Sequence, residues 1–298
     1  MNALLPAIVP VSLIIAIGYL AGFSLTLDRQ TLSHLTLYIL VPALIASSLY
    51  QATLPVMSAL GLVVGFGCTS GLSYGLVILL GKLLKFPADL EKSLVATTLF
   101  ANSGNLGLPL ITVAFGDAGR ERAVVYLIAA SILLAIAGPV LLKREGLGVG
   151  LRVTLQLPLM WATIAGILLN LLALPLPLRL DQGMEMLGSA AIPVALVLLG
   201  VQLSQIRLAL GWYELFASGM RLVVSPLVAY GVGVLLRLEV LDLQVLVMQS
   251  AMPAAVNNLI WVTEFGGDPP RVARTIVIST VLSFVTLPTI LWLSRIGG

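Results

Sequence analysis

Long apolar stretches recur along nearly the whole chain, and short connections between them hold most of the charged residues. Most of the stretches have about 20 residues or more, which is the length of helix that crosses a hydrocarbon core of about 30 Å. We expect ten membrane-spanning helices. They cover residues 3–22, 31–50, 57–81, 89–116, 120–142, 153–173, 185–204, 209–236, 240–266 and 271–295.

The composition agrees with a chain that lies almost wholly in a membrane. Of its 298 residues, 59% are hydrophobic and 10% are charged, and the mean hydropathy is +1.09. An average soluble domain carries roughly 25% charged residues, so a cytosolic enzyme, a disordered chain and a fibrous protein are excluded. We therefore expect an all-α polytopic protein whose surroundings are the lipid bilayer.

The side chains that usually perform catalysis are scarce. The chain has one His and one Cys, which leaves few ligands for a metal cage and few partners for a Ser, Cys and His catalytic set. We expect no enzymatic activity, no metal site and no cofactor. The basic residues stand singly between apolar runs rather than on one face, which argues against a nucleic-acid partner.

The basic residues in the connections predict the orientation, because cytoplasmic loops collect Lys and Arg. With ten spans, ten basic residues fall on one side of the membrane and five on the other. We therefore expect both termini on the outer, periplasmic side of the inner cell membrane. The ten are Arg29, Lys82, Lys85, Lys92, Lys143, Arg144, Arg152, Arg207, Arg271 and Arg274, and the five are Arg120, Arg122, Arg179, Arg237 and Arg295.

The two halves of the chain share features at nearly one spacing, about 150 residues, which indicates an internal repeat. Each half, 1–145 and 146–298, then holds five predicted spans. Because five is odd, the second half enters from the opposite side, and the two repeats are inverted. Such repeats suit alternating access. The matched features are Pro42 with Pro193, Phe115-Gly116 with Phe265-Gly266, and Pro139 with Pro288.

The fourth predicted span is interrupted in its middle. Asn and Gly residues alternate there and a proline follows, and inside a helix Gly costs about 1 kcal/mol and Pro about 3 kcal/mol relative to Ala. Non-helical backbone at that depth persists only where it is buried in protein or lines a wet cavity. The residues are Asn102, Gly104, Asn105, Gly107 and Pro109.

The ninth span is interrupted at the matching place, and paired interruptions are the best sequence indicator of a transporter's binding site. At an offset of 150 residues, Pro253 falls opposite Ser103. The plainer alternative is a pair of proline kinks with Asn side chains that join helices. The residues of this second break are Gln249, Ser250, Pro253, Asn257 and Asn258.

The charge that such a site prefers follows from what surrounds it. No Asp or Glu lies between Thr97 and Gly116, or between Leu243 and Thr263. Helices that restart after the breaks present free N–H groups with about half a positive charge each, and Asn amides add donors. We therefore expect a small organic anion, a carboxylate, to bind where the breaks cross.

Arg221 stands well inside the eighth span, and the sequence allows two interpretations of it. A buried Arg could neutralise a carboxylate substrate, and it is a candidate substrate contact on that basis. Alternatively, the long eighth span lets Arg221 extend toward the cytoplasmic interface or pair with Glu214.

Three motifs resemble the auxin efflux carrier family, which includes plant PIN-type exporters and bacterial malate or malonate permeases. They are Asn102-Ser-Gly-Asn-Leu-Gly-Leu-Pro109, Met252-Pro-Ala-Ala-Val-Asn257 and Ser279-Thr-Val-Leu-Ser283, which leads to Pro288. The resemblance spans essentially the whole chain. It implies that the crossover positions of the family lie at Asn102, Asn105, Pro109, Pro253 and Asn257.

The resemblance also implies a fold. It is similar to that of bile-acid symporters and sodium/proton antiporters, with ten helices in two inverted repeats and with the broken fourth and ninth helices crossed. A scaffold, residues 1–55 and 150–205, often forms a homodimer. A transport unit, residues 57–145 and 208–298, moves against it as an elevator. The acidic pair of the sodium/proton antiporters is absent from this sequence.

Secondary transport of a small organic anion such as malate, malonate or an auxin-like acid is therefore the first functional hypothesis. The alternative is a facilitated uniporter or channel for organic anions or weak acids, because the sequence shows no evident membrane-buried carboxylate to couple H⁺ and no evident acidic cluster to hold Na⁺. The coupling ion stays open between H⁺, Na⁺ and none.

Overall fold

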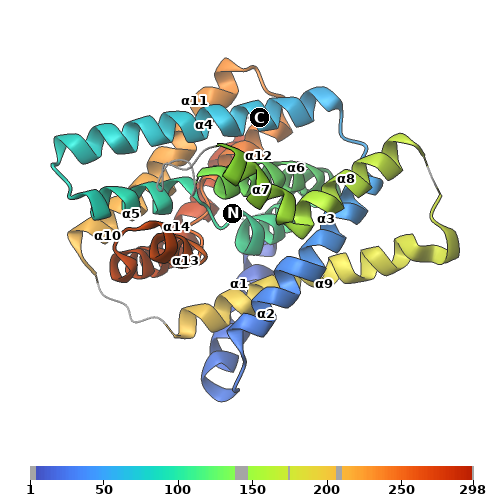
Figure 1. Ribbon diagram of the computed structural model, residues 1–298, viewed down its shortest axis with the longest axis horizontal. Coiled ribbons are helices and arrows are strands. Elements are labelled where there is room, and N and C mark those ends of the chain that lie inside the picture. The colour runs from blue at the N-terminus through green and yellow to red at the C-terminus, as the bar shows by residue number, and fades with distance from the viewer. Residues whose placement is uncertain (1–4, 138–146, 174, 206–209, 297–298) are drawn as a thin grey trace.

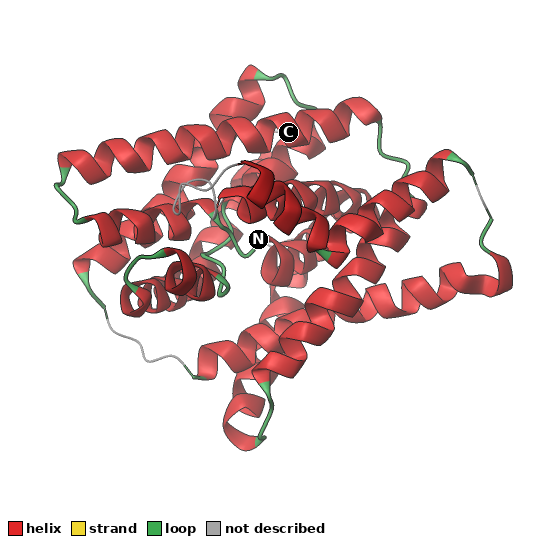
Figure 2. Cartoon of the chain, viewed as in Figure 1, coloured by secondary structure: helices red, strands yellow, loops and turns green. Residues whose placement is uncertain are grey.

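The computed structural model describes residues 5–137, 147–173, 175–205 and 210–296, and nearly all of them are helical (Figure 2). Three π-helical turns and one 3₁₀ turn join or extend α-helices: η1 Thr36–Leu40, η2 Ser103–Gly107, η5 Met220–Val224 and η4 Pro177–Arg179. The α-helices are α1 Leu5–Ser24, α2 Arg29–Leu35, α3 Val41–Tyr50, α4 Val56–Leu83, α5 Ala88–Leu99, α6 Leu108–Ala137, α7 Leu147–Gln156, α8 Pro158–Leu171, α9 Leu180–Ser204, α10 Trp212–Gly219, α11 Ser225–Leu235, α12 Val240–Ser250, α13 Asn258–Phe265 and α14 Pro269–Ile296.

Within the described chain, five helical segments are long and apolar enough to cross a membrane, so the protein is an integral membrane protein. They are Arg29–Tyr50, Val56–Leu83, Pro177–Ser204, Trp212–Leu235 and Pro269–Leu293. The other predicted spans are also helical where described. They have shorter apolar segments, as in Val9–Ser24 of α1 and in α8, or are interrupted or kinked, as between α5 and α6, at Gly116 within α6, and between α12 and α13.

Two glycines with positive φ separate neighbouring helical segments in matching parts of the chain. Gly116, with φ 65° and ψ −156°, divides α6 where the fourth predicted span ends and the fifth begins. Gly266, with φ 96°, ends α13 before α14. A side chain would strain both conformations. The correspondence predicted between Phe115-Gly116 and Phe265-Gly266 therefore extends to the backbone.

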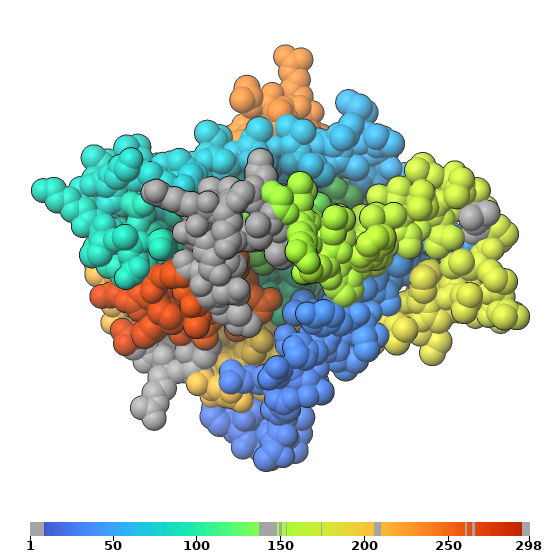
Figure 3. Space-filling view, viewed as in Figure 1, coloured from blue at the N-terminus to red at the C-terminus, as the bar shows by residue number. Residues whose placement is uncertain are grey.

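The helices pack in two groups on either side of α6. Helices α1, α3, α8 and α9 pack on one another, while α4, α5 and α10–α14 form the second group (Figure 1). On the face in Figure 3, the blue and yellow-green residues of the first group lie below and to the right of the cyan and orange-red residues of the second. Helix α9 contacts both α1 and η2, so the first group reaches the interrupted segment.

The close contact between α1 and α9 depends on glycine. A Cβ on Gly18 would lie 2.3 Å from the carbonyl oxygen of Val197, and one on Gly200 would lie 2.2 Å from that of Ile15. Small residues at such crossings let two helix backbones touch, which is how helices associate where lipid removes the usual hydrophobic drive. This pair therefore makes the first group tightly packed.

Large apolar side chains cover the outward faces of many helices. Leu20, Phe23, Leu72 and Trp161 are each more than half exposed. A soluble monomer rarely exposes apolar surface on this scale, whereas a lipid environment favours it. The exposed faces agree with the membrane location that the helix lengths indicate.

Candidate functional site

The first predicted interruption lies between α5 and α6. Helix α5 ends at Leu99, and Phe100 adopts an extended conformation with φ −100° and ψ 94°. Asn102 follows with φ −76° and ψ 53°, and helical structure resumes at Ser103 in η2 and continues into α6. The Asn and Gly residues predicted to oppose a continuous helix therefore occupy the break and the π turn after it.

The second predicted interruption lies between α12 and α13. Helix α12 ends at Ser250, and residues 251–257 form turns and extended backbone before α13 begins at Asn258. Pro253 lies in this segment, where its missing N–H costs no helical hydrogen bond.

The two interruptions meet and pair through their backbones. The N–H of Asn102 donates to the carbonyl oxygen of Pro253 at 2.8 Å, and the N–H of Ala255 donates to that of Phe100 at 3.0 Å. Between these bonds, Ala101 and Ala254 form an antiparallel bridge. The breaks therefore cross at one point, which we call the crossing.

The register of this pairing differs from the one that the sequence spacing predicted. The two bonds exchange with each other when residue numbers shift by 153, from 102 to 255 and from 100 to 253. Pro253 thus corresponds to Phe100 and not to Ser103, and Asn258 corresponds to Asn105. The predicted spacing of 150 came from proline and glycine positions elsewhere in the halves, and the breaks need not keep it.

Asn258 joins the two half-helices through its side chain. Its Nδ2 donates to the carbonyl oxygens of Ala96 at 3.1 Å and Phe100 at 3.0 Å, and so satisfies carbonyls at the C-terminal end of α5. Its Oδ1 is buried without a hydrogen-bond partner among the described residues. The Asn258 amide, which we expected to contact a ligand, therefore stabilises the crossing instead.

Arg221 satisfies the C-terminal carbonyls of both interrupted helices. Its Nε donates to Met252 O at 2.7 Å, and its terminal nitrogens donate to Ser250 O at 2.6 Å, to Gln249 O at 3.4 Å and to Thr98 O. The residue is 3% exposed and comes from η5.

This arrangement corrects one of the two interpretations of Arg221. The side chain does not extend to an interface. Glu214 does not pair with it either, because that carboxylate lies 3.5 Å from Arg271 Nη1 and 3.8 Å from Arg274 Nη1. The local reason is that broken helices leave carbonyl groups without partners inside the protein, and a buried guanidinium satisfies several of them at once.

Further polar groups at the crossing have no partner in the described part of the chain. Asn102 Nδ2 and both amide atoms of Gln249 are buried and make no hydrogen bond. Gln249 Oε1 lies 2.2 Å from the position that a Cβ on Gly107 would take, so it packs directly on the backbone of the other repeat. The side chains of Asn105 and Asn257 are half-buried, and no described residue bonds to them.

Comparison with known proteins shows the family of the chain. The sequence profile of a family described as membrane transport protein matches the chain twice, over residues 3–150 and 144–291. The chain belongs to this family, the auxin efflux carrier family of membrane transporters. It is therefore a transporter and not an enzyme, and its two halves are repeats of one unit.

Three relatives are similar over most of their length. An "Uncharacterized transporter" of Methanothermobacter thermautotrophicus is 31% identical over 271 residues, which cover 89% of this chain and 88% of the relative. An uncharacterized transporter of Methanocaldococcus jannaschii is 26% identical over 95% and 96% of the two chains. A protein of Rhizobium meliloti named "Putative malonate transporter" is 23% identical over 96% and 94%.

The remaining candidate residues of the transporter also lie in or beside the breaks. Gly104 is half-buried in η2, and Pro109 is buried in the first turn of α6. Ser250 is buried, and its Oγ lies 3.4 Å from the hydroxyl of Tyr126.

Three contributors to the crossing could not be recognised from the sequence pattern alone. Thr98 provides a carbonyl to Arg221, Tyr126 reaches Ser250 from α6, and Ser279 Oγ of α14 accepts a hydrogen bond from Ala254 N at 3.2 Å. Tyr126 stands in an ordinary apolar run, which gave no signal. Ser279 carried a signal only as part of a family motif.

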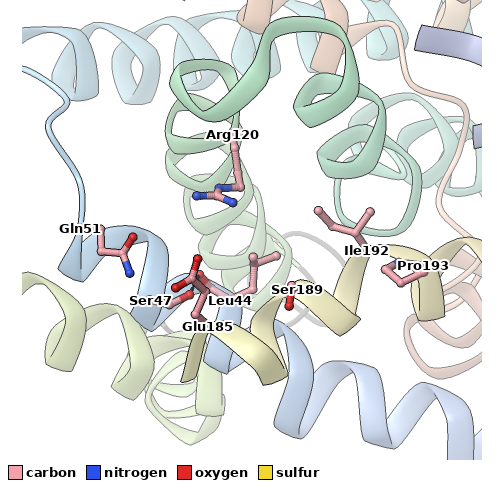
Figure 4. Close-up of a pocket in the computed structure, with 8 residues that line it drawn as sticks. All are labelled: Leu44, Ser47, Gln51, Arg120, Glu185, Ser189, Ile192 and Pro193. Atoms are coloured by element: carbon pink, nitrogen blue, oxygen red, sulfur yellow. Dashed lines mark hydrogen bonds between the residues drawn. The ribbon is translucent and has the colours of Figure 1, made fainter. Parts of the chain in front are cut away.

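A separate cavity of about 170 Å³ lies away from these residues, and none of the candidate site residues lines it. Figure 4 shows Arg120 entering from α6 opposite Glu185 and Ser189 of α9 and Ser47 of α3. Arg120 pairs with the exposed Asp117 at 3.2 Å. The cavity therefore lies where the first group of helices meets α6, and not at the crossing.

Proposed function

We propose that this protein is a secondary transporter that moves a small organic anion with a carboxylate group across the inner membrane. The anion binds at the crossing, and alternating access exposes that site to each side in turn. The observation that carries the proposal is the pair of exchanged hydrogen bonds, Asn102 to Pro253 and Ala255 to Phe100. These bonds join the two interrupted segments, and helical structure restarts after each of them.

The chemistry of the crossing favours a negative charge. Two helical segments begin there, η2 with α6 and α13, and each N-terminus carries about half a positive charge, while the opposite partial charges of the α5 and α12 carbonyl ends face the guanidinium of Arg221. Neither break contains an Asp or Glu. The half-buried amides of Asn105 and Asn257 are available as donors, and a carboxylate accepts several such bonds. The candidate ligand contacts are therefore these two amides and the backbone beside them.

The fold offers a route for alternating access. We assign to the chain ten membrane-spanning segments in two inverted five-helix repeats. The two repeats exchange their conformations between the inward-open and the outward-open state. The close packing of α1, α3, α8 and α9 supports these helices as the scaffold, against which α4–α6 and α10–α14 move as an elevator. We place both termini outside and a homodimer contact on the scaffold.

Malonate is the first substrate to test, because a relative of 23% identity is named a putative malonate transporter. Malate and monocarboxylates belong in the same panel. The uniporter alternative draws support from one observation. The buried carboxylates of Asp242 and Glu214 are each within ion-pair distance of arginine, which opposes a proton-carrying role for them.

Uptake of labelled malonate, malate and a monocarboxylate into proteoliposomes tests the proposal. We expect saturable uptake by the wild type that unlabelled substrate inhibits. Asn105→Ala and Asn257→Ala should each reduce uptake about tenfold or more, because a hydrogen bond to a charged group contributes about 1.5–3 kcal/mol. Gln182→Ala, at an exposed amide on α9, is the matched control and should not change uptake.

Two results contradict the proposal. Equal uptake by the wild type and by both Asn variants would show that the anion does not bind at the crossing. Uptake of cations but of no carboxylate would show that the protein does not transport an organic anion. A protonophore and the omission of sodium then separate coupled transport, which either treatment abolishes, from uniport, which neither affects.

A further inference from the structure

A single guanidinium donates hydrogen bonds to the C-terminal carbonyl groups of helices from both repeats. Arg221 donates to Thr98 O at the end of α5 and to the carbonyls of Gln249, Ser250 and Met252 at and after the end of α12. The residue is 3% exposed, and the described side chain beside it that can ionise is Tyr126 of α6. Arg221 thus carries a buried positive charge whose partners are neutral carbonyls.

The repeats are symmetric in their backbone pairing but not in this charge. Neither the shift of 153 residues that exchanges the two backbone bonds nor the shift of 150 that relates features elsewhere places a basic residue of α4 opposite Arg221, because the two shifts give Cys68 and Gly71. Cys68 is exposed. Within the described residues, one arginine from the second repeat therefore serves both breaks, and α4 of the first repeat carries no basic side chain at either of these positions.

The charges at the crossing can be compared in sign and size. Two carbonyl ends meet two N–H ends there, and each end carries about half an elementary charge, so the four contributions roughly cancel. The full charge of Arg221 then remains, with no Asp or Glu in either break to oppose it. Its donors are engaged with carbonyls, which leaves the N–H ends and the amides of Asn105 and Asn257 to contact a ligand.

We propose that Arg221 is the positioning residue that sets the anion preference of the crossing: it holds the carbonyl ends together and supplies the net positive charge, without being the group that hydrogen-bonds the substrate. The ligand class is an anion with one carboxylate at the crossing. This inference rests on the proposed function and deepens it.

The test compares malonate with malonamide, a neutral analogue of the same size, as inhibitors of labelled malonate uptake. The wild type should prefer malonate. Arg221→Gln should lose about tenfold or more of this preference, because a unit charge still acts over several ångströms inside a protein. Arg221→Lys keeps the charge but has fewer and less spread donors, so it should keep the preference with a lower maximal rate. Arg237→Gln, at an exposed arginine after α11, is the control.

The outcomes separate this inference from the proposed function. A wild type that takes up malonate while Arg221→Gln keeps the full preference overturns the role of Arg221 alone. A wild type that does not prefer malonate or any other carboxylate overturns both. If Arg221→Gln does not purify as a folded protein, Arg221→Lys decides. Retained preference with a lower maximal rate supports the inference, and lost preference contradicts it.

Discussion

The backbone N–H of Asn102 donates to the carbonyl oxygen of Pro253 at 2.8 Å, across 151 residues of sequence. With its counterpart from Ala255 to Phe100, this bond makes Ala101 and Ala254 a directly opposed pair whose two residues are not hydrogen-bonded to each other. In such antiparallel pairs the Cα atoms are about 4.5 Å apart. The crossing is thus a short piece of sheet-like pairing between two broken helices.

The pairing predicts a specific disulfide. Because Cα separations of about 4.4–6.8 Å suit a disulfide, Ala101→Cys with Ala254→Cys should cross-link under mild oxidation in a Cys68→Ser background. Ala101→Cys with Val256→Cys, two residues out of register, should not. Mass spectrometry of peptides without reductant measures both. Cross-linking of the second pair but not the first would show that the register is wrong.

Gly107 should tolerate no side chain, whereas Gly104 should. A Cβ at Gly107 would lie 2.2 Å from Gln249 Oε1 and 3.1 Å from Met252 Cγ, while one at Gly104 meets only Leu127 Cδ1 at 3.5 Å. Gly107→Ala should therefore cost about 1–3 kcal/mol of stability and most of the uptake. Gly104→Ala should be neutral or slightly stabilising. Thermal unfolding and initial uptake rates measure the pair, and equal effects would contradict the contact with Gln249.

Gln249→Glu should abolish anion uptake, although the two side chains have nearly the same size and shape. The side chain of Gln249 is fully buried, and the backbone carbonyl oxygen of the same residue accepts a hydrogen bond from Arg221. A carboxylate at this position would neutralise the positive charge of the crossing and repel a second carboxylate. Gln249→Met, of similar size and without charge, should retain more uptake than Gln249→Glu. The reverse order would show that charge does not decide binding here.

Asp242 and Asp117 should differ sharply in their contribution to stability. Asp242 is buried, and its Oδ1 lies 2.5 Å from Arg122 Nε, which joins α12 to α6. Removing one partner of a buried pair costs about 3–5 kcal/mol, so Asp242→Asn should lower the thermal transition clearly. Asp117 is 82% exposed beside Arg120, and Asp117→Asn should cost at most about 1 kcal/mol. Similar transitions for both variants would contradict a supporting role for the Arg122 pair.

The sequence predicted the elements that depend on local chemistry. Gly, Asn and Pro residues oppose a continuous helix wherever they stand, so both interruptions could be located before any coordinates. The length of the apolar stretches is likewise a local property of the sequence, and it indicated where helices lie. These predictions needed no knowledge of what packs against what.

The sequence could not predict how the polar groups are shared. Asn257 and Asn258 are adjacent and chemically identical, yet Asn258 is used to satisfy α5 while Asn257 stays without a described partner. The carbonyl ends that Arg221 satisfies belong to helices whose relative placement only the fold sets. The register shift from 150 to 153 residues has the same origin, because pairing depends on backbone geometry and not on the spacing of prolines.

Protection of cysteines at the crossing by the transported anion tests the central claim most directly. In a Cys68→Ser background, Gly104→Cys, next to Asn105 in the chain, and Ala255→Cys, two residues before Asn257, introduce thiols at half-buried positions of the interrupted segments without removing either amide, and Thr263→Cys at an exposed position of α13 is the control. The rate of labelling by a small maleimide is measured with and without malonate. We predict that malonate slows labelling at 104 and 255 severalfold and leaves position 263 unchanged. Equal rates with and without malonate at both crossing positions, in protein that still takes up malonate, would contradict binding at the crossing.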